Sequence, residues 1–241
     1  MIRIGLVIGG SGGIGAACAA ALAGSVDRVI LVGSSVDRLT APADRVGPTA
    51  LPLAADITSE HGRAAIVDQA GAEGTELAWV VIASGRPLRE PFADTPPASI
   101  EETLAADLVG PILLTRALSD VRWAPRAALV LIGSISASRG LPNRAVYSAA
   151  KAGLERFGAS LAAEWQPRGI RVNIVAPGVI DTPFTGGDRA NLERWSRERV
   201  PAGRPGIAEE VAELVRYVVL DAPDFVVGAR LVIDGGSEAI A

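Results

Sequence analysis

Short apolar runs rich in Val, Ile and Leu alternate along this chain with longer, alanine-rich segments of helical spacing. Most of these runs are continuously apolar, as expected for strands that are buried on both faces. Strands that alternate with helices form parallel βαβ units, and right-handed crossovers arrange them as a doubly wound sheet. The pattern predicts one α/β domain over residues 1–241, with strands at 3–8, 29–32, 50–53, 78–82, 127–132, 171–175 and 230–233 and helices at 13–23, 59–72, 99–119, 147–164 and 208–220.

Two stretches need a separate interpretation. The opening "MIRIGLVIGG" is apolar but has no basic leader, and it runs straight into a glycine cluster, so we predict a first strand rather than a signal peptide. No apolar run is long enough to span a bilayer, and we expect a cytoplasmic protein without membrane contact. The stretch 183–206 has no strand signal and is rich in Gly, Pro, Arg and Trp. A long irregular insertion of this kind predicts a substrate lid.

The residue counts exclude several classes of site. The single cysteine, Cys18, rules out an internal disulfide or a cysteine metal cluster, and it is expected to be a small buried residue. The single histidine, His61, rules out a multi-histidine zinc site and is expected on the surface. With a net charge of −4 and no basic cluster, a nucleic-acid partner is not expected, and no metal site is predicted.

A glycine cluster, "VIGGSGGIG", follows the first predicted strand and opens the first predicted helix. It fits both GxGxxG, at Gly10, Gly12 and Gly15, and GxxxGxG, at Gly9, Gly13 and Gly15. Either pattern gives a tight turn at which backbone N–H groups and a helix N-terminus can approach a pyrophosphate. The cluster therefore predicts a dinucleotide site, the alternative being a glycine turn that only allows close packing of helix and strand.

The end of the second predicted strand bears on which dinucleotide would bind. NAD-binding proteins place a carboxylate there to accept from the ribose hydroxyls. Here Gly33, Ser34 and Ser35 occupy the region, and Asp37 comes too late. Two hydroxyls, with Arg38 nearby, favour a ribose 2′-phosphate, so NADP(H) is expected over NAD(H). A plain turn with two serines remains an alternative.

The only lysine of the chain, Lys151, lies four residues after Tyr147 in "YSAAK". At this spacing both side chains lie on one face of a helix. A phenol holds its proton too firmly for acid–base catalysis at neutral pH, and a nearby ammonium stabilises the phenolate. Ser134 follows the strand "ALVLIGS", at the carboxyl end of a parallel strand, where ligands bind in open α/β sheets. These three residues predict a site for carbonyl chemistry, and the alternative is an ordinary polar pair on an amphipathic helix.

Further segments match one family. The turn "IGGSGGIG" at 8–15 is similar to TGxxxGIG, "VIASG" at 81–85 to NNAG, "DLVG" at 107–110 to NxxG, and "APGVIDT" at 176–182 to a PG segment that contacts nicotinamide. With "AAD" ending at Asp56, "YSAAK", "PAGRPGIAEEVA" and "GARLVIDGG", the chain resembles the short-chain dehydrogenase/reductase family along nearly its whole length. The 3-oxoacyl carrier-protein reductases are especially similar. This resemblance implies a Rossmann fold and an NADP(H)-dependent oxidoreductase that reduces a ketone or oxidises a secondary alcohol.

The same resemblance assigns roles to individual residues. Tyr147 would donate the proton, Ser134 would orient the carbonyl, and Lys151 would bind ribose and stabilise the phenolate. Asp107 stands at the position of the fourth catalytic residue. The residues implied to contact the cofactor are Gly9, Ser11, Gly13, Ile14, Gly15, Ser34, Ser35, Asp56, Ile57, Ala83, Gly85, Tyr147, Lys151, Pro177, Gly178, Ile180 and Thr182.

Two departures from the family pattern keep a second function open. The NNAG asparagines are missing from Ile82–Gly85, and Asp107 replaces an asparagine. Asp107 could keep the asparagine's backbone role, or it could pair with Lys151 and retune the site. The alternative function is a non-catalytic dinucleotide-binding regulator on the same fold.

The substrate and the assembly are less constrained by the sequence. Phe184, Trp195 and the arginines of the predicted lid could line a substrate pocket, or they could belong to a solvated arginine-rich helix with Trp195 packed inward. The substrate class is a small carbonyl or alcohol. The resemblance implies a homotetramer that assembles through the helices at 99–119 and 147–164 and through the last strand.

Overall fold

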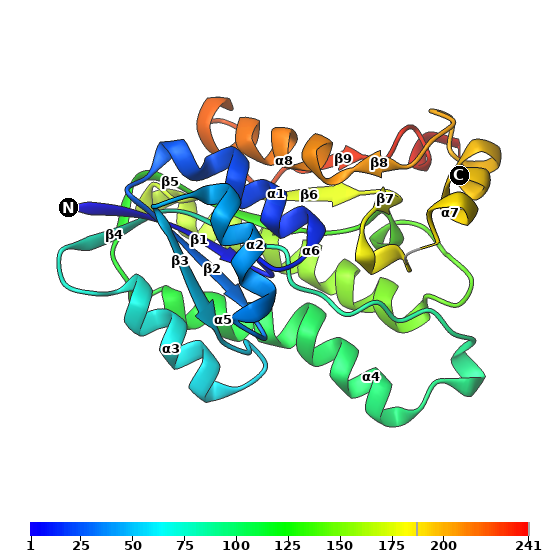
Figure 1. Cartoon of the computed structure of the whole chain (residues 1–241), viewed down its shortest axis with the longest axis horizontal. Helices are drawn as coiled ribbons and strands as arrows, with labels where there is room; N and C mark the ends of the chain where they lie inside the picture. Colours follow the sequence, from blue (N-terminus) through cyan, green and yellow to red (C-terminus); the bar gives the residue numbers. More distant parts are fainter. Residues whose placement is uncertain (187, 241) are drawn as a thin grey trace.

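A single sheet of seven parallel strands forms the centre of the computed structural model, which describes residues 1–186 and 188–240 (Figure 1). Gly187, within the expected lid, and Ala241, the last residue of the expected domain, lie outside the described residues. The strands, in the order β3-β2-β1-β4-β5-β6-β9, are β1 (Ile2–Ile8), β2 (Arg28–Gly33), β3 (Ala50–Ala54), β4 (Thr75–Ile82), β5 (Trp123–Ile132), β6 (Arg171–Pro177) and β9 (Arg230–Ile233). This is the predicted doubly wound sheet, so the fold class is confirmed.

Helices cover both faces of the sheet, as Figure 1 shows. Leu22, Leu39 and Val215 bury the faces of three helices against one side of the sheet, and Ile66 and Leu154 belong to the core on the other side. The first side carries α1 (Gly13–Leu22), α2 (Asp37–Val46) and α8 (Ala208–Arg216), and the second carries α3 (Glu60–Ala70), α5 (Gly110–Leu118) and α6 (Ala145–Trp165). Burial of these apolar faces stabilises the sheet between two helical layers.

Two predicted helices need correction, and one helix was not predicted. The helix α2 was not predicted, because Pro42 lies inside it and few of its residues are apolar. The helix expected over 99–119 is interrupted: α4 (Pro97–Leu104) continues through the π-helical turn η3 (Ala105–Val109) into α5. The helix expected over 208–220 likewise ends in a π-helical turn, η7 (Tyr217–Asp221). A π-helical turn has no distinct residue pattern, and such turns occur frequently at functional sites.

The stretch expected to form a lid is held at both ends. The short strand β7 (Ile180–Asp181) pairs with β8 (Gly206–Ile207), which brings the start and the end of the stretch together. Between them lie η6 (Pro183–Thr185) and α7 (Arg189–Arg199), so the arginine-rich part is a helix. In Figure 1, β7, β8 and α7 lie at the end of the molecule opposite the N-terminus.

Cys18 and His61 occupy the environments that the sequence predicted. Cys18 is fully buried in α1, and this burial raises the pKa of its thiol to about 12, so it is a packing residue and not a nucleophile. His61 is exposed at the start of α3. Within the described part of the chain, none of the helices has the length and apolarity needed to cross a bilayer.

Candidate active site

The glycine turn brings backbone close to backbone and leaves a helix N-terminus open. Gly9 has a positive φ of 82°, and a Cβ there would lie 2.8 Å from the carbonyl carbon of Ala83. A Cβ on Gly15 would collide with the carbonyl oxygen of Gly9. The N-cap of α1 is Gly12, which has no side chain to cap the first N–H groups. These N–H groups can therefore donate to an anion at the helix N-terminus.

A cavity of about 120 Å³ lies against this turn, at the carboxyl ends of the central strands. Its wall includes most of the predicted cofactor residues: Gly13, Ile14, Gly15, Ala83, Gly85, Tyr147, Lys151, Pro177, Gly178, Ile180 and Thr182. Ser134 lines it as well, and so do several residues that were not predicted as cofactor contacts: Gly12, Ser84, Ile132, Gly133, Phe184 and Thr185. Ile132 and Gly133 directly precede Ser134, so their position next to a predicted site residue could have indicated them.

The remaining predicted cofactor residues lie outside the wall of this cavity. Gly9 packs behind it, and Ser11 lies against Gly33, where a Cβ would come 3.0 Å from the Ser11 hydroxyl. Ser34 is exposed and Ser35 is half-buried, directly after β2. These serines lie beyond the glycine turn, and their contact with a cofactor ribose stays a prediction.

Asp56 and Ile57 are engaged elsewhere through their side chains. Asp56 Oδ1 accepts hydrogen bonds from Thr58 N at 2.9 Å and Thr58 Oγ1 at 2.8 Å. The Ile57 side chain is buried in the core, so this residue could reach a ligand only through its backbone.

Lys151 forms a buried ion pair with Asp107. The distance from Lys151 Nζ to Asp107 Oδ1 is 3.0 Å, with side-chain exposures of 4% and 0%. Lys151 Nζ also donates to the carbonyl of Ile132 at 3.2 Å, and Asp107 Oδ2 accepts from Arg86 N at 2.8 Å. Asp107 is supplied by the π-helical turn η3, and Lys151 by α6. The sequence left open whether Asp107 pairs with Lys151, and the structure brings the two together.

The charges around Lys151 decide its ionisation. Burial alone lowers the pKa of Lys151, but the charges of Asp107, Tyr147 and Glu155 and the contact with Asp107 outweigh it, so the pKa is raised above its ordinary value. The residue is therefore an ammonium at neutral pH. Gly85 has to be small here, because a Cβ on it would come 2.7 Å from Asp107 Oδ1.

Tyr147 and Ser134 flank the same space. Tyr147 is buried, with its ring centroid 5.8 Å from Lys151 Nζ and 6.0 Å from the ring centroid of Phe184. Ser134 Oγ accepts a hydrogen bond from Ser136 N at 3.1 Å, which leaves the hydroxyl proton of Ser134 available to another oxygen.

A second and larger cavity, of about 650 Å³, adjoins the first. Ser134, Tyr147, Gly178, Phe184 and Thr185 line both cavities, so the phenol and the serine hydroxyl stand where the two cavities meet.

Residues 184–199 of the expected lid contribute unequally to the larger cavity. Phe184, Trp195 and Arg199 line it, as one of the two interpretations expected. Arg189 does not, and it pairs instead with Asp181 and Glu193. Arg194 and Arg197 are exposed outside the lining, so these arginines belong to a solvated helix face.

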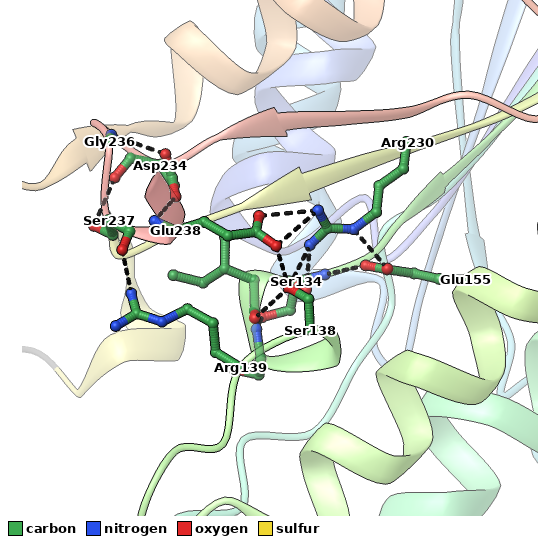
Figure 2. A network of polar contacts seen from close by, with 11 residues as sticks. Ser134, Ser138, Arg139, Glu155, Arg230, Asp234, Gly236, Ser237 and Glu238 are labelled. Carbon is green, nitrogen blue, oxygen red and sulfur yellow. Dashed lines mark hydrogen bonds and ion pairs between the residues drawn. The ribbon is translucent and has the colours of Figure 1, made fainter. Parts of the chain in front are cut away.

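An ion-pair network holds Ser134 against the last strand (Figure 2). Arg230, on β9, pairs with Glu155 at 2.7 Å and with Glu238 at 2.9 Å. Glu155 in turn accepts from Ser134 N at 3.1 Å. Figure 2 also shows Arg139 donating to the carbonyl of Ser237, which lines the larger cavity. The sequence analysis missed Glu155 and Arg230, because their partners are distant in the chain.

Comparison with known proteins places this geometry in a family. A family model described as enoyl-(acyl carrier protein) reductase matches residues 9–238. The chain is 36% identical to cis-4-hydroxycyclohexanecarboxylate dehydrogenase from Sinomonas cyclohexanicum, over 99% of this chain and 97% of that relative. It is 31% identical to 3-oxoacyl-(acyl-carrier-protein) reductase from Escherichia coli, over 97% and 96% of the two chains. The crystal structure of a dehydrogenase/reductase from Sinorhizobium meliloti superposes with a TM-score of 0.89 at 32% identity, covering 98% of this chain and 94% of the other.

The chain belongs to the short-chain dehydrogenase/reductase family and is an oxidoreductase with the Rossmann fold of that family. Membership implies a nicotinamide dinucleotide cofactor and a small-molecule substrate.

The residues at the smaller cavity fit such a cofactor. The glycine turn and the uncapped N-terminus of α1 suit a pyrophosphate. In addition, the residue Ser84 lines the cavity, and its Oγ is buried with no hydrogen-bond partner among residues 1–186 and 188–240. A buried hydroxyl without a partner is costly, so a polar ligand at this wall would satisfy it.

We predict that Gly15→Ala weakens NADPH binding, with the Kd rising at least about tenfold, because the added Cβ meets the backbone oxygen of Gly9 and forces the turn open. Gly24→Ala is the matched control, since no described atom lies near its added Cβ. Fluorescence titration with NADPH measures both. Equal Kd values for the two variants would contradict the role of the glycine turn.

Proposed function

We propose that the protein is an NADP(H)-dependent oxidoreductase that interconverts a ketone and a secondary alcohol at Ser134, Tyr147 and Lys151. The observation that carries this proposal is the position of Ser134 and Tyr147 in the walls of both cavities. A substrate in the larger cavity would then meet a cofactor in the smaller one beside a phenol and a hydroxyl.

Each of these residues has a distinct task in the proposed reaction. The nicotinamide, when bound, supplies or accepts the hydride. Tyr147 Oη gives its proton to the substrate oxygen during reduction and takes it back during oxidation. Ser134 donates a hydrogen bond to the same oxygen, and its backbone is held by Glu155. The ammonium of Lys151 stabilises the phenolate that Tyr147 forms, and Asp107 holds Lys151 in place.

The alternative function, a non-catalytic regulator that binds a dinucleotide, has two departures in its favour, Asp107 and the altered NNAG segment. Two contacts favour the enzyme instead. Asp107 still touches Lys151 at 3.0 Å, and Lys151 still lies against the Tyr147 ring. The names of two relatives suggest candidate substrates, a cyclic hydroxy acid and a carrier-bound 3-oxoacyl group.

We predict that Tyr147→Phe lowers kcat by about 10²- to 10⁴-fold while the Kd for NADPH stays close to that of the wild type. The phenol proton is used in the chemical step, whereas the glycine turn holds the cofactor. Tyr217→Phe is the matched control, because Tyr217 is the only other tyrosine and lies 43% exposed in η7. Steady-state reduction of a ketone panel measures kcat, and near-normal turnover by Tyr147→Phe would refute the assignment.

The cofactor preference depends on the residues that follow β2. No carboxylate follows β2, and the exposed Ser34 can donate to a ribose 2′-phosphate. We therefore predict that the protein binds NADPH more tightly than NADH and that Ser34→Asp moves the preference towards NADH by charge repulsion. Titration of both proteins with both cofactors tests this, and tighter NADH binding by the wild type would show that the inference is wrong.

The homotetramer and the cytoplasmic location stay predictions. Val109 in η3 and Leu113 in α5 are 46% and 42% exposed, which suits a helical interface with a second copy. Leu154 and Leu161 of α6 belong to the core against the sheet, so they are not available to such an interface.

A further inference from the structure

The larger cavity has a strongly uneven charge. Among the described residues, four arginines line it, namely Arg89, Arg139, Arg144 and Arg199, against a single acidic residue, Asp188. Asp188 Oδ1 already accepts from Asn191 N at 3.0 Å as the N-cap of α7. A cavity lined mainly by one sign of charge concentrates ligands of the opposite sign.

Arg144 lies over the ring of Tyr147. It precedes α6, three residues before Tyr147, and its guanidinium carbon lies 5.5 Å from the centroid of the Tyr147 ring. Its side chain forms no ion pair and no hydrogen bond with any residue in 1–186 or 188–240. Burial holds the pKa of Arg144 below its ordinary value, against an opposing effect of Tyr147, and Arg89 adds to the lowering. A half-buried guanidinium without a counter-charge is a costly arrangement that an anionic ligand would relieve.

The other three arginines are less suited to bind an anionic ligand beside Tyr147. Arg139 already donates to the carbonyl of Ser237. Arg199 lies over the Trp195 ring, with its guanidinium carbon 5.8 Å from the ring centroid. Arg89 is exposed. They add positive potential to the cavity, whereas Arg144 combines proximity to Tyr147 with free donors.

We propose that the substrate carries a carboxylate and that Arg144 binds it while the substrate's reacting oxygen meets Tyr147 and Ser134; this rests on the proposed function. A guanidinium presents parallel N–H donors that match the two oxygens of a carboxylate. Because Arg144 and Tyr147 lie side by side in one cavity, the substrate is a compact oxo or hydroxy acid. Arg144 thereby becomes a specificity-determining residue for the reaction.

The test compares two ketones of similar shape and different charge, 4-oxocyclohexanecarboxylate and its carboxamide. We expect the wild type to favour the carboxylate in kcat/KM. Arg144→Gln should reduce that preference by about 10- to 100-fold, the loss expected for hydrogen bonds to a charged group. Arg144→Lys keeps the positive charge but lacks the parallel N–H donors of the guanidinium. Its preference for the carboxylate should therefore fall between those of the wild type and Arg144→Gln. Arg197→Gln removes one exposed positive charge from α7 outside the cavity lining, and its preference should equal that of the wild type.

A second readout needs no turnover. Cyclohexanecarboxylate should raise the Tm of the NADPH-bound wild type more than cyclohexanecarboxamide does, and Arg144→Gln should abolish that difference. Equal Tm shifts for the two ligands, or kcat/KM values that Arg144→Gln lowers equally for both ketones, would overturn the carboxylate proposal. Tyr147-dependent reduction of the carboxamide would still support the proposed function in that case, so the two proposals can fail separately.

Discussion

The buried ion pair between Lys151 and Asp107 is the interaction on which the rest of the site depends. Breaking a buried pair by removing one partner typically costs about 3–5 kcal/mol, so both residues need precise support. The π-helical turn η3 places the carboxylate, α6 places the ammonium, and the end of β5 adds the carbonyl of Ile132. Gly85 leaves room for the pair, because a Cβ at this position would collide with Asp107 Oδ1. One ionic contact thereby fixes the relative positions of two helical segments and the end of a central strand.

The chemistry of the cavity follows from that arrangement. Once Lys151 is fixed, its position on α6 carries Tyr147 to the junction of the two cavities. Ser134 reaches the same junction from the other direction, held through Glu155 by Arg230 of β9 (Figure 2). Tyr147 and Ser134 are thus positioned by two different ion pairs, Lys151–Asp107 and Arg230–Glu155. Side chains held in this way at the carboxyl ends of the central strands are positioned more precisely than side chains on loops alone.

Much of this arrangement could be predicted from the sequence, because its signals are local. Continuous apolar runs gave the strands, the glycine spacing gave the turn, and the i,i+4 spacing put Tyr147 and Lys151 on one helix face. The π-helical turns were not predicted because they have no characteristic residue pattern. The helix α2 was not predicted because Pro42, which usually interrupts a helix, lies inside it. The contacts of Arg230 with Glu155 and the convergence of four arginines join residues far apart in the chain. Such contacts come from tertiary packing, on which periodicity and spacing give no information.

The central claim is that Asp107 limits the positive charge that Lys151 presents to Tyr147. The most direct test is the pH dependence of kcat/KM for alcohol oxidation in the wild type and in Asp107→Asn, with the exposed Asp120→Asn as the control for a lost surface charge. In Asp107→Asn the charges of Tyr147 and Glu155 still favour the ammonium of Lys151, which no longer has a carboxylate to offset it and therefore stabilises the phenolate more strongly. The basic limb of the profile should move to lower pH in Asp107→Asn and stay in place in Asp120→Asn. An unchanged limb in Asp107→Asn, or one that moves to higher pH, would contradict the account.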